Sequence, residues 1–144
     1  MLIGISKLIS PELLKLLMEM GHGDEIVFAD ANFPAASMAR RLVRCDGHPM
    51  PELLDGVLQL FPLDQYVAHR VTLMAVVPGD KVETPIWGRY GEIIQNRTGL
   101  DTPFETVERF AFYERAKQAY AVVATGESAQ YANLILKKGV ITGQ

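Results

Sequence analysis

A helix pattern ends and an apolar strand begins within Met20-Gly21-His22-Gly23-Asp24-Glu25-Ile26-Val27-Phe28-Ala29-Asp30. His22 stands between two glycines, so no neighbouring side chain covers its imidazole, and Asp30 follows the last apolar residue of the strand. Ligands of open α/β sheets bind outside the carboxyl ends of the strands. We therefore expect Asp30 to contact a ligand and His22 to take part in chemistry. The alternative is that Gly21 caps a helix and His22 lies in a surface turn.

Helical patterns alternate with short apolar segments on both sides of this stretch. Ser10-Pro11-Glu12 is typical of a helix start, because serine caps, proline fits the first turn and an acid favours the helix N-terminus. Residues 37–41 are expected to form a loop or a short helix. The predicted helices are residues 11–20, 51–61, 85–97 and 112–119. The predicted strands are residues 26–30, 42–45, 71–77, 120–124 and 134–136, and residues 107–110 are expected to be a strand or the end of one.

This alternation predicts an α/β fold in which a central sheet is flanked by helices. A chain of 144 residues is long enough for one domain with a sizeable core, and no linker or internal repeat divides it, so we expect residues 1–144 to form a single compact layered domain. Residues 71–77 are the most continuous apolar run, which indicates a central strand covered on both faces.

Composition and charge exclude several classes of function. The net charge is −3, and no cluster of Lys and Arg is longer than a pair, so we expect no nucleic-acid partner. The single cysteine, Cys45, excludes an intrachain disulfide and reads as a small buried hydrophobe. No apolar run approaches the roughly 18 residues of a membrane span. We expect a soluble, cytoplasmic protein that does not interact with a membrane.

Common cofactor and catalytic motifs do not fit this sequence. Gly21-His22-Gly23 follows a helix and precedes a strand, whereas the dinucleotide fingerprint needs the reverse order and a third glycine. His22, Asp24 and Glu25 are too close in sequence to complete a coordination sphere together. There is also no G-x-S-x-G motif around a serine. We therefore expect neither a metal nor another cofactor.

A set of polar residues remains at the predicted strand ends and breaks. Carboxylate, amide, guanidinium and phenol groups converging near one imidazole suit a polyhydroxylated ligand, because each sugar hydroxyl both donates and accepts hydrogen bonds. Structural roles are the alternative for each residue alone, for example an ion pair of Arg109 with Glu105 or Glu108. Trp87 is expected to pack partly in the core or to face a neighbouring subunit. The set comprises His22, Asp30, Asp64, Arg109, Tyr113, Tyr131 and Asn133.

Several blocks of this sequence resemble the L-fucose mutarotase family, which is related to the D-ribose pyranases. The resemblance extends from Leu8 to Val140, and the blocks occur in the family's order with compatible spacing. They are Leu8-Ile9-Ser10-Pro11-Glu12-Leu13-Leu14, Met20-Gly21-His22-Gly23-Asp24-Glu25-Ile26, Asp30 with Asn32-Phe33-Pro34, Arg109-Phe110, Phe112-Tyr113-Glu114-Arg115-Ala116, Thr125-Gly126-Glu127 and Tyr131-Ala132-Asn133-Leu134-Ile135-Leu136.

The resemblance implies a compact α/β domain in a ring-forming homo-oligomer, typically a decamer, with active sites at the interfaces of adjacent subunits. The implied reaction is the interconversion of the α and β anomers of free L-fucose, without a cofactor or a metal. By resemblance, His22 is the proton donor and Tyr113 assists proton transfer. The implied sugar contacts are Asp30, Asp64, Arg109, Tyr131, Ala132 and Asn133.

Two other functions stay open from the sequence. Ala132 is the residue found at this position in ribose-type relatives, whereas fucose-type members often have glycine, so a D-ribose pyranase is one alternative. One protein can also catalyse both pyranose–furanose exchange and mutarotation. The other alternative is a sugar-binding or regulatory protein that uses the same pocket without catalysis.

Overall fold

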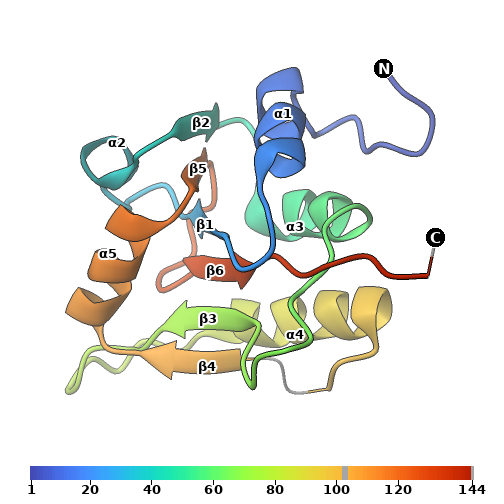
Figure 1. Cartoon of the computed structure of the whole chain (residues 1–144). Helices are drawn as coiled ribbons and strands as arrows, with labels where there is room; N and C mark the ends of the chain where they lie inside the picture. Colours follow the sequence, from blue (N-terminus) through green and yellow to red (C-terminus); the bar gives the residue numbers. More distant parts are fainter. Residues whose placement is uncertain (102–103, 144) are drawn as a thin grey trace.

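The computed structural model describes residues 1–101 and 104–143 and shows a compact α/β domain (Figure 1). The helices are α1 (Pro11–Glu19), α2 (Ala35–Met38), α3 (Met50–Leu58), α4 (Pro85–Thr98) and α5 (Arg109–Gln118). The strands are β1 (Glu25–Ala29), β2 (Leu42–Cys45), β3 (Val71–Met74), β4 (Phe104–Val107), β5 (Ala121–Thr125) and β6 (Leu134–Lys137).

All six strands belong to one mixed sheet in the order β2-β5-β1-β6-β3-β4. β1, β2 and β5 are parallel to one another, as are β3 and β4, while β6 runs antiparallel to both β1 and β3. The carboxyl ends of the five parallel-running strands therefore meet the start of β6 at one edge of the sheet. We call this the carboxyl edge, and the other the amino edge.

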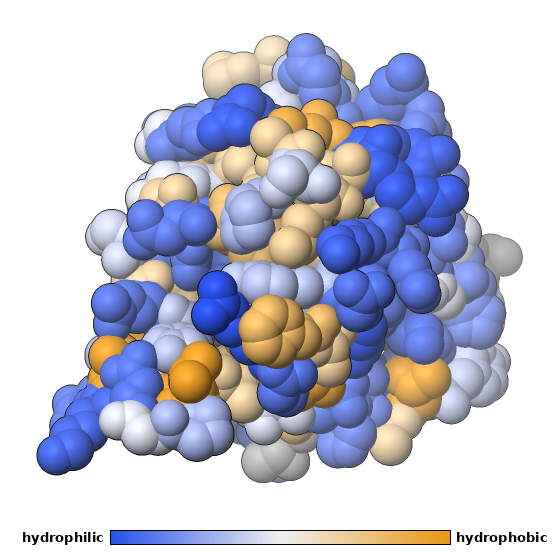
Figure 2. Space-filling model, turned by 90° about the vertical axis from the view of Figure 1, so that its left-hand side faces the viewer, coloured by the Kyte–Doolittle hydropathy of each residue, from blue (hydrophilic) through white to orange (hydrophobic). Residues whose placement is uncertain are grey.

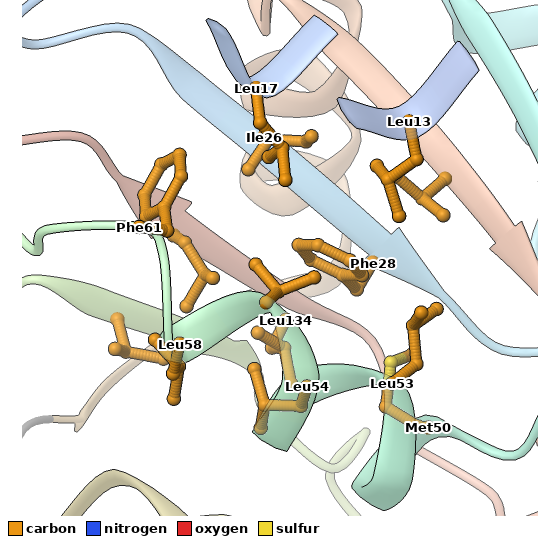
Figure 3. Close-up of a cluster of buried hydrophobic side chains, with 14 of the residues drawn as sticks. Leu13, Leu17, Ile26, Phe28, Met50, Leu53, Leu54, Leu58, Phe61 and Leu134 are labelled. Carbon is orange, nitrogen blue, oxygen red and sulfur yellow. The ribbon is translucent and has the colours of Figure 1, made fainter. Parts of the chain in front are cut away.

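Helices cover both faces of the sheet. Side chains of α1, α3 and α4 pack with Ile26 and Phe28 of β1, whereas α2 and α5 pack with Val27 and Ala29, which point the other way. Burial of a Leu, Ile or Phe side chain contributes about 1.5–3 kcal/mol, so the first cluster supplies much of the stability. Figure 3 shows part of that cluster, with Leu13, Leu17, Ile26, Phe28, Met50, Leu53, Leu54, Leu58, Phe61 and Leu134.

The predicted α/β fold with a central sheet is confirmed, and several elements form for the predicted reasons. Ser10 caps α1, because its Oγ accepts a hydrogen bond from the N–H of Leu13 at 3.1 Å. β1 ends at Ala29, which places Asp30 directly after the strand. β3 lies inside the sheet between β6 and β4, and all four of its residues are buried.

Three predicted boundaries are wrong. The second helix ends at Leu58 rather than at residue 61, because Phe61 precedes a proline and the chain tightens into a turn before it. β3 ends at Met74 rather than at residue 77, because at this level β4 ends at Val107 and β6 begins at Leu134. Val107 is the end of a strand, as predicted for the start of residues 107–110, but the last helix begins at Arg109 rather than at residue 112.

None of the helices in residues 1–101 and 104–143 combines the length and the apolar character that crossing a bilayer requires.

Candidate active site

A cavity of about 390 Å³ opens at the carboxyl edge of the sheet. Figure 2 shows the side of the molecule on which α2 and α5 lie in Figure 1, where hydrophilic and apolar side chains are interspersed. The size of the cavity falls within the range of about 300–1,000 Å³ for small-molecule pockets. Polar side chains dominate its lining, and three apolar residues complete it. The lining residues are Asp30, Asn32, Phe33, Met74, Val77, Asp80, Arg109, Tyr113, Gln130, Tyr131 and Asn133.

Asp30 and Asn133 are positioned by the adjacent strands β1 and β6. The N–H of Asp30 donates to Oδ1 of Asn133 at 2.7 Å, and the N–H of Asn32 donates to Oδ1 of Asp30 at 3.0 Å. Burial raises the pKa of the Asp30 carboxyl above its usual value, although backbone N–H groups oppose this effect. A ligand hydroxyl would therefore stabilise a carboxylate that water solvates poorly.

Arg109 and Tyr113 project from the first turns of α5. Glu108 caps this helix, because its carboxylate accepts hydrogen bonds from the N–H groups of Phe110 and Ala111. The four-residue spacing puts both side chains on one side of the helix, and Nε of Arg109 donates to the Tyr113 hydroxyl at 3.0 Å. Arg109 makes no ion pair with a neighbouring glutamate within the described part of the chain.

Tyr131 bridges two loops at the cavity. Its backbone has φ 54°, the one positive φ among the described non-glycine residues. The hydroxyl donates to Oδ2 of Asp80 at 2.7 Å and accepts from the N–H of Val77 at 3.4 Å. The hydrogen bond to Asp80 raises the pKa of the Tyr131 phenol. A strained residue at a cavity is a common mark of a functional position.

Helix α4 supports the same segment from behind. Nε1 of the half-buried Trp87 donates to the carbonyl of Tyr131 at 2.7 Å, and the buried hydroxyl of Tyr90 donates to the carbonyl of Ala132 at 2.8 Å. Ala132 itself is buried, and its side chain does not line the cavity. Trp87 also packs against the core cluster, as its expected partial burial implies.

His22 and Asp64 form a pair at the amino edge of the sheet. Nε2 of His22 lies 3.1 Å from Oδ1 of Asp64, and their side chains are 45% and 3% exposed. The N–H of Tyr66 donates to the same carboxylate oxygen at 3.0 Å. This hydrogen bond, together with the one to His22, lowers the pKa of the Asp64 carboxyl. The buried carboxylate can therefore hold the imidazole with its other nitrogen toward solvent.

The loop that carries His22 is fixed by Lys138, the residue after β6. The Lys138 ammonium donates to the carbonyls of Leu17 and Met20 at 2.7 and 2.6 Å, which satisfies the end of α1. Its backbone carbonyl accepts from the N–H of Gly23 at 2.8 Å. The residue after α1, Met20, is extended, and the left-handed residue of this loop is Gly23, with φ 87°. Gly21 is therefore not a left-handed helix cap.

The predicted site residues thus fall into two groups in one chain. Asp30, Arg109, Tyr113, Tyr131 and Asn133 line the cavity at the carboxyl edge. The pair of His22 and Asp64 lies beyond the opposite end of β1, a strand of five residues that spans roughly 16 Å. The expected convergence of the polar residues near the imidazole therefore does not occur within a single chain.

Met74 and Asp80 are among the residues that line the cavity and were not predicted from the sequence. Met74 forms part of the apolar lining at the end of β3, and Asp80 follows in the next loop. The strand-end rule that identified Asp30 could have identified both. Pro78-Gly79-Asp80 instead served only as the signal that ends a strand. Within residues 1–101 and 104–143, no three His, Cys, Asp or Glu side chains are grouped so that they could hold a metal ion.

Comparisons of this chain with a family model and with known proteins agree on one family. A model described as the RbsD / FucU transport protein family matches residues 3–141. The L-fucose mutarotase of Actinobacillus pleuropneumoniae is 53% identical over 140 residues, which cover 97% of each chain. The fucose mutarotase of Homo sapiens is 52% identical over 144 aligned residues, covering 96% of this chain and 93% of the human protein.

A solved structure agrees with this result. The crystal structure of the fucose mutarotase in complex with L-fucose from Streptococcus pneumoniae superposes with a TM-score of 0.94 at 55% identity. The match covers 98% of this chain and 100% of the other.

Proposed function

The chain belongs to the RbsD / FucU family, and we propose that it is an L-fucose mutarotase, an isomerase that interconverts the α and β anomers of free L-fucose. Identity above 50% over nearly the whole length to proteins of that name carries the proposal. The cavity at the carboxyl edge supports it, because its carboxylate, amide, guanidinium and phenol groups match the hydroxyls of a sugar.

The cavity offers complementary partners for a deoxy sugar. Asp30, after β1, accepts hydrogen bonds, the Asn133 amide, before β6, can donate them, and Arg109 adds a cationic donor from α5. Met74 and Val77 provide an apolar surface suited to the methyl group of L-fucose. The backbone of the Tyr131–Ala132 segment completes the proposed sugar contacts.

Mutarotation requires proton transfer at two oxygen atoms. A base removes the proton of the anomeric hydroxyl while an acid protonates the ring oxygen, and the C1–O5 bond breaks to give the open-chain aldehyde. Rotation about the C1–C2 bond and ring closure on the other face give the second anomer. An imidazole can both take and give a proton near neutral pH, which suits His22 to this reversible exchange, with Tyr113 as the second group.

Asp64 acts, in this proposal, through His22. Its buried carboxylate is 3.1 Å from Nε2 of His22 and receives a second hydrogen bond from the Tyr66 backbone. It fixes the ring so that Nδ1 faces the substrate, and it stabilises the imidazolium that forms during catalysis. The sugar contact that the resemblance implies for Asp64 is compatible with this position only if the sugar also reaches His22.

A complete site then needs two subunits, with the His22–Asp64 pair of one copy placed against the cavity of another. Exposed apolar side chains border both halves: Phe110, beside Arg109, is 65% exposed, and Tyr66, whose ring centroid is 5.6 Å from that of His22, is 69% exposed. Burial of these two side chains would stabilise the contact. We therefore propose a homo-oligomer with shared active sites, and a decamer is the form expected from the resemblance.

Saturation-transfer proton NMR tests the function directly. We expect the protein to accelerate exchange between the anomeric signals of α- and β-L-fucopyranose. The variant His22→Ala is expected to lose most of the roughly 10²–10⁴-fold contribution of general acid–base catalysis. Faster exchange of D-ribose forms alone would identify a D-ribose pyranase. Sugar binding without faster exchange of either sugar would leave a sugar-binding or regulatory protein.

A further inference from the structure

Asp80 presents a second carboxylate to the cavity, from the loop between β3 and α4. On the basis of the proposed function, we propose that Asp80 is a further sugar-binding residue, which accepts a hydrogen bond from a hydroxyl group of L-fucose. The proposal rests on its place in the cavity lining, on its contact with Tyr131 and on its remaining capacity as an acceptor.

Local contacts hold the Asp80 side chain at the cavity. The N–H of Asp80 donates to the carbonyl of Val77 at 3.0 Å, and Oδ1 of Asp80 accepts from the N–H of Val82 at 3.1 Å. These two bonds form a turn, in which Gly79 has φ 90°. A carboxylate in a turn commonly has this structural role and no other.

The second carboxylate oxygen is used differently. Oδ2 of Asp80 accepts the hydroxyl proton of Tyr131 at 2.7 Å, across 51 residues of sequence, and the turn itself does not need this bond. It directs the phenol and the carboxylate toward one another at the cavity. Tyr131 is in turn fixed by Trp87 through its backbone carbonyl. The position of the acceptor is thus set by three segments of the chain.

The carboxylate keeps acceptor capacity for a ligand. Its two oxygens offer about four lone-pair positions, and the bonds from Val82 and Tyr131 occupy two of them. Asp80 is also exposed, so a hydroxyl group in the cavity can reach it. Asp30 and Asp80 then give the site two anionic acceptors, and Arg109 provides a balancing cation in the same lining.

The chain contains its own probe for the test. Trp87 is the single tryptophan, and its indole donates to the Tyr131 carbonyl, so its fluorescence is expected to change when L-fucose binds. Titration with L-fucose gives dissociation constants for the wild type, Asp80→Asn, Tyr131→Phe and the double variant. Asp55→Asn is the matched control, since Asp55 accepts hydrogen bonds from Arg97 and does not line the cavity.

Asp80→Asn keeps an acceptor oxygen for the turn and loses the negative charge. We expect its dissociation constant for L-fucose to rise roughly five- to tenfold, the difference between a charged and a neutral acceptor, and Asp55→Asn to match the wild type. If Asp80 contacts the sugar, this rise also occurs when Tyr131→Phe is already present. Equal affinities of Tyr131→Phe and the double variant would overturn the proposal and leave Asp80 as a residue that positions Tyr131.

The same titration separates this proposal from the proposed function. Unchanged binding by Asp80→Asn would refute the role of Asp80 even if the wild type accelerates anomer exchange. Weaker binding by Asp80→Asn, in a protein that binds L-fucose without accelerating exchange, would support Asp80 and refute the mutarotase. A wild type that does not bind L-fucose would refute both.

Discussion

Two inactive variants are expected to restore activity to each other if active sites are shared between subunits. His22→Ala removes the imidazole at the amino edge, and Arg109→Ala removes the guanidinium from the cavity at the carboxyl edge. Arg109 is exposed and, within the described residues, has no hydrogen bond to a buried side chain, so its loss should change the free energy of unfolding by no more than about 0.5 kcal/mol. His22→Ala removes one hydrogen bond from the buried Asp64, which keeps the one from Tyr66, so a cost of about 1–3 kcal/mol is expected. This cost is below the stability of roughly 5–15 kcal/mol that is typical of a domain. Each variant alone is therefore expected to fold and to be inactive.

The fraction of activity that the mixture should recover follows from the separation of His22 and Arg109. The five residues of β1 alone span roughly 16 Å, so one sugar molecule cannot touch both groups of the same chain. In a random mixture of equal amounts, half of the subunits provide an intact His22 and half an intact Arg109. About one quarter of the sites then contain both, provided that each site takes its halves from different subunits.

Co-expression of the two variants, followed by the anomer-exchange assay, measures this recovery. The control is wild type co-expressed with the double variant His22→Ala/Arg109→Ala. Shared sites predict about one quarter of full activity in both mixtures. Sites within one chain predict none in the first mixture and about one half in the control. The second pattern would refute the assignment of His22 and the cavity to different subunits.

Three further results are expected from the described contacts. Tyr90→Phe leaves the buried carbonyl of Ala132 without its donor, so the free energy of unfolding should fall by about 1–2 kcal/mol. In thermal unfolding, each kcal/mol should lower the melting temperature by about 2–4 °C. A Cβ at Gly139 would lie 2.4 Å from the carbonyl oxygen of Leu63, so Gly139→Ala should cost about 2–3 kcal/mol in denaturant titrations, whereas Gly47→Ala, where nothing lies within 4 Å, should not. Hydrogen bonds lower the pKa of Asp64, so its stabilising effect is complete above the ordinary carboxyl pKa of 3.8 and is lost as the pH falls through its lower, folded-state value. The difference in unfolding free energy between the wild type and Asp64→Asn should therefore shrink below about pH 4; a constant difference would contradict this linkage.

Local patterns were sufficient to predict the elements whose ends are set locally. Ser10 caps α1, and the apolar residues of β1 end at an acid, so both signals lie within a few residues. The start of α5 was missed because its cap is Glu108, a residue type that is less typical at this position than Ser, Thr, Asp or Asn. β3 stops at Met74 because β4 ends and β6 begins at this level, which depends on pairing between distant segments.

The candidate site was also predictable only where local sequence determines it. Asp30 could be found because it follows a strand, and ligand sites of α/β sheets lie at the carboxyl ends of strands. Asn133 could be found as a polar residue directly before an apolar strand. Their separation from His22 could not, because it depends on which end of the sheet each loop occupies. That arrangement is fixed by the antiparallel insertion of β6 between β1 and β3, which brings Lys138 to the His22 loop and Asn133 to Asp30.

The separation of His22 from the cavity supports the proposed coupling of catalysis to assembly. The described residues that line the cavity include carboxyl, amide, phenol and guanidinium groups, which suit sugar binding, but no imidazole. The imidazole of His22 is held by a buried carboxylate at the amino edge, at the opposite end of β1 from this cavity. General acid–base catalysis requires the acid or base within hydrogen-bonding reach of the proton that moves. In the proposed shared site, one chain binds the sugar at its carboxyl edge, and a second copy presents the His22 imidazole from its amino edge, so contact between the two copies would bring both functions to the same oxygen atoms.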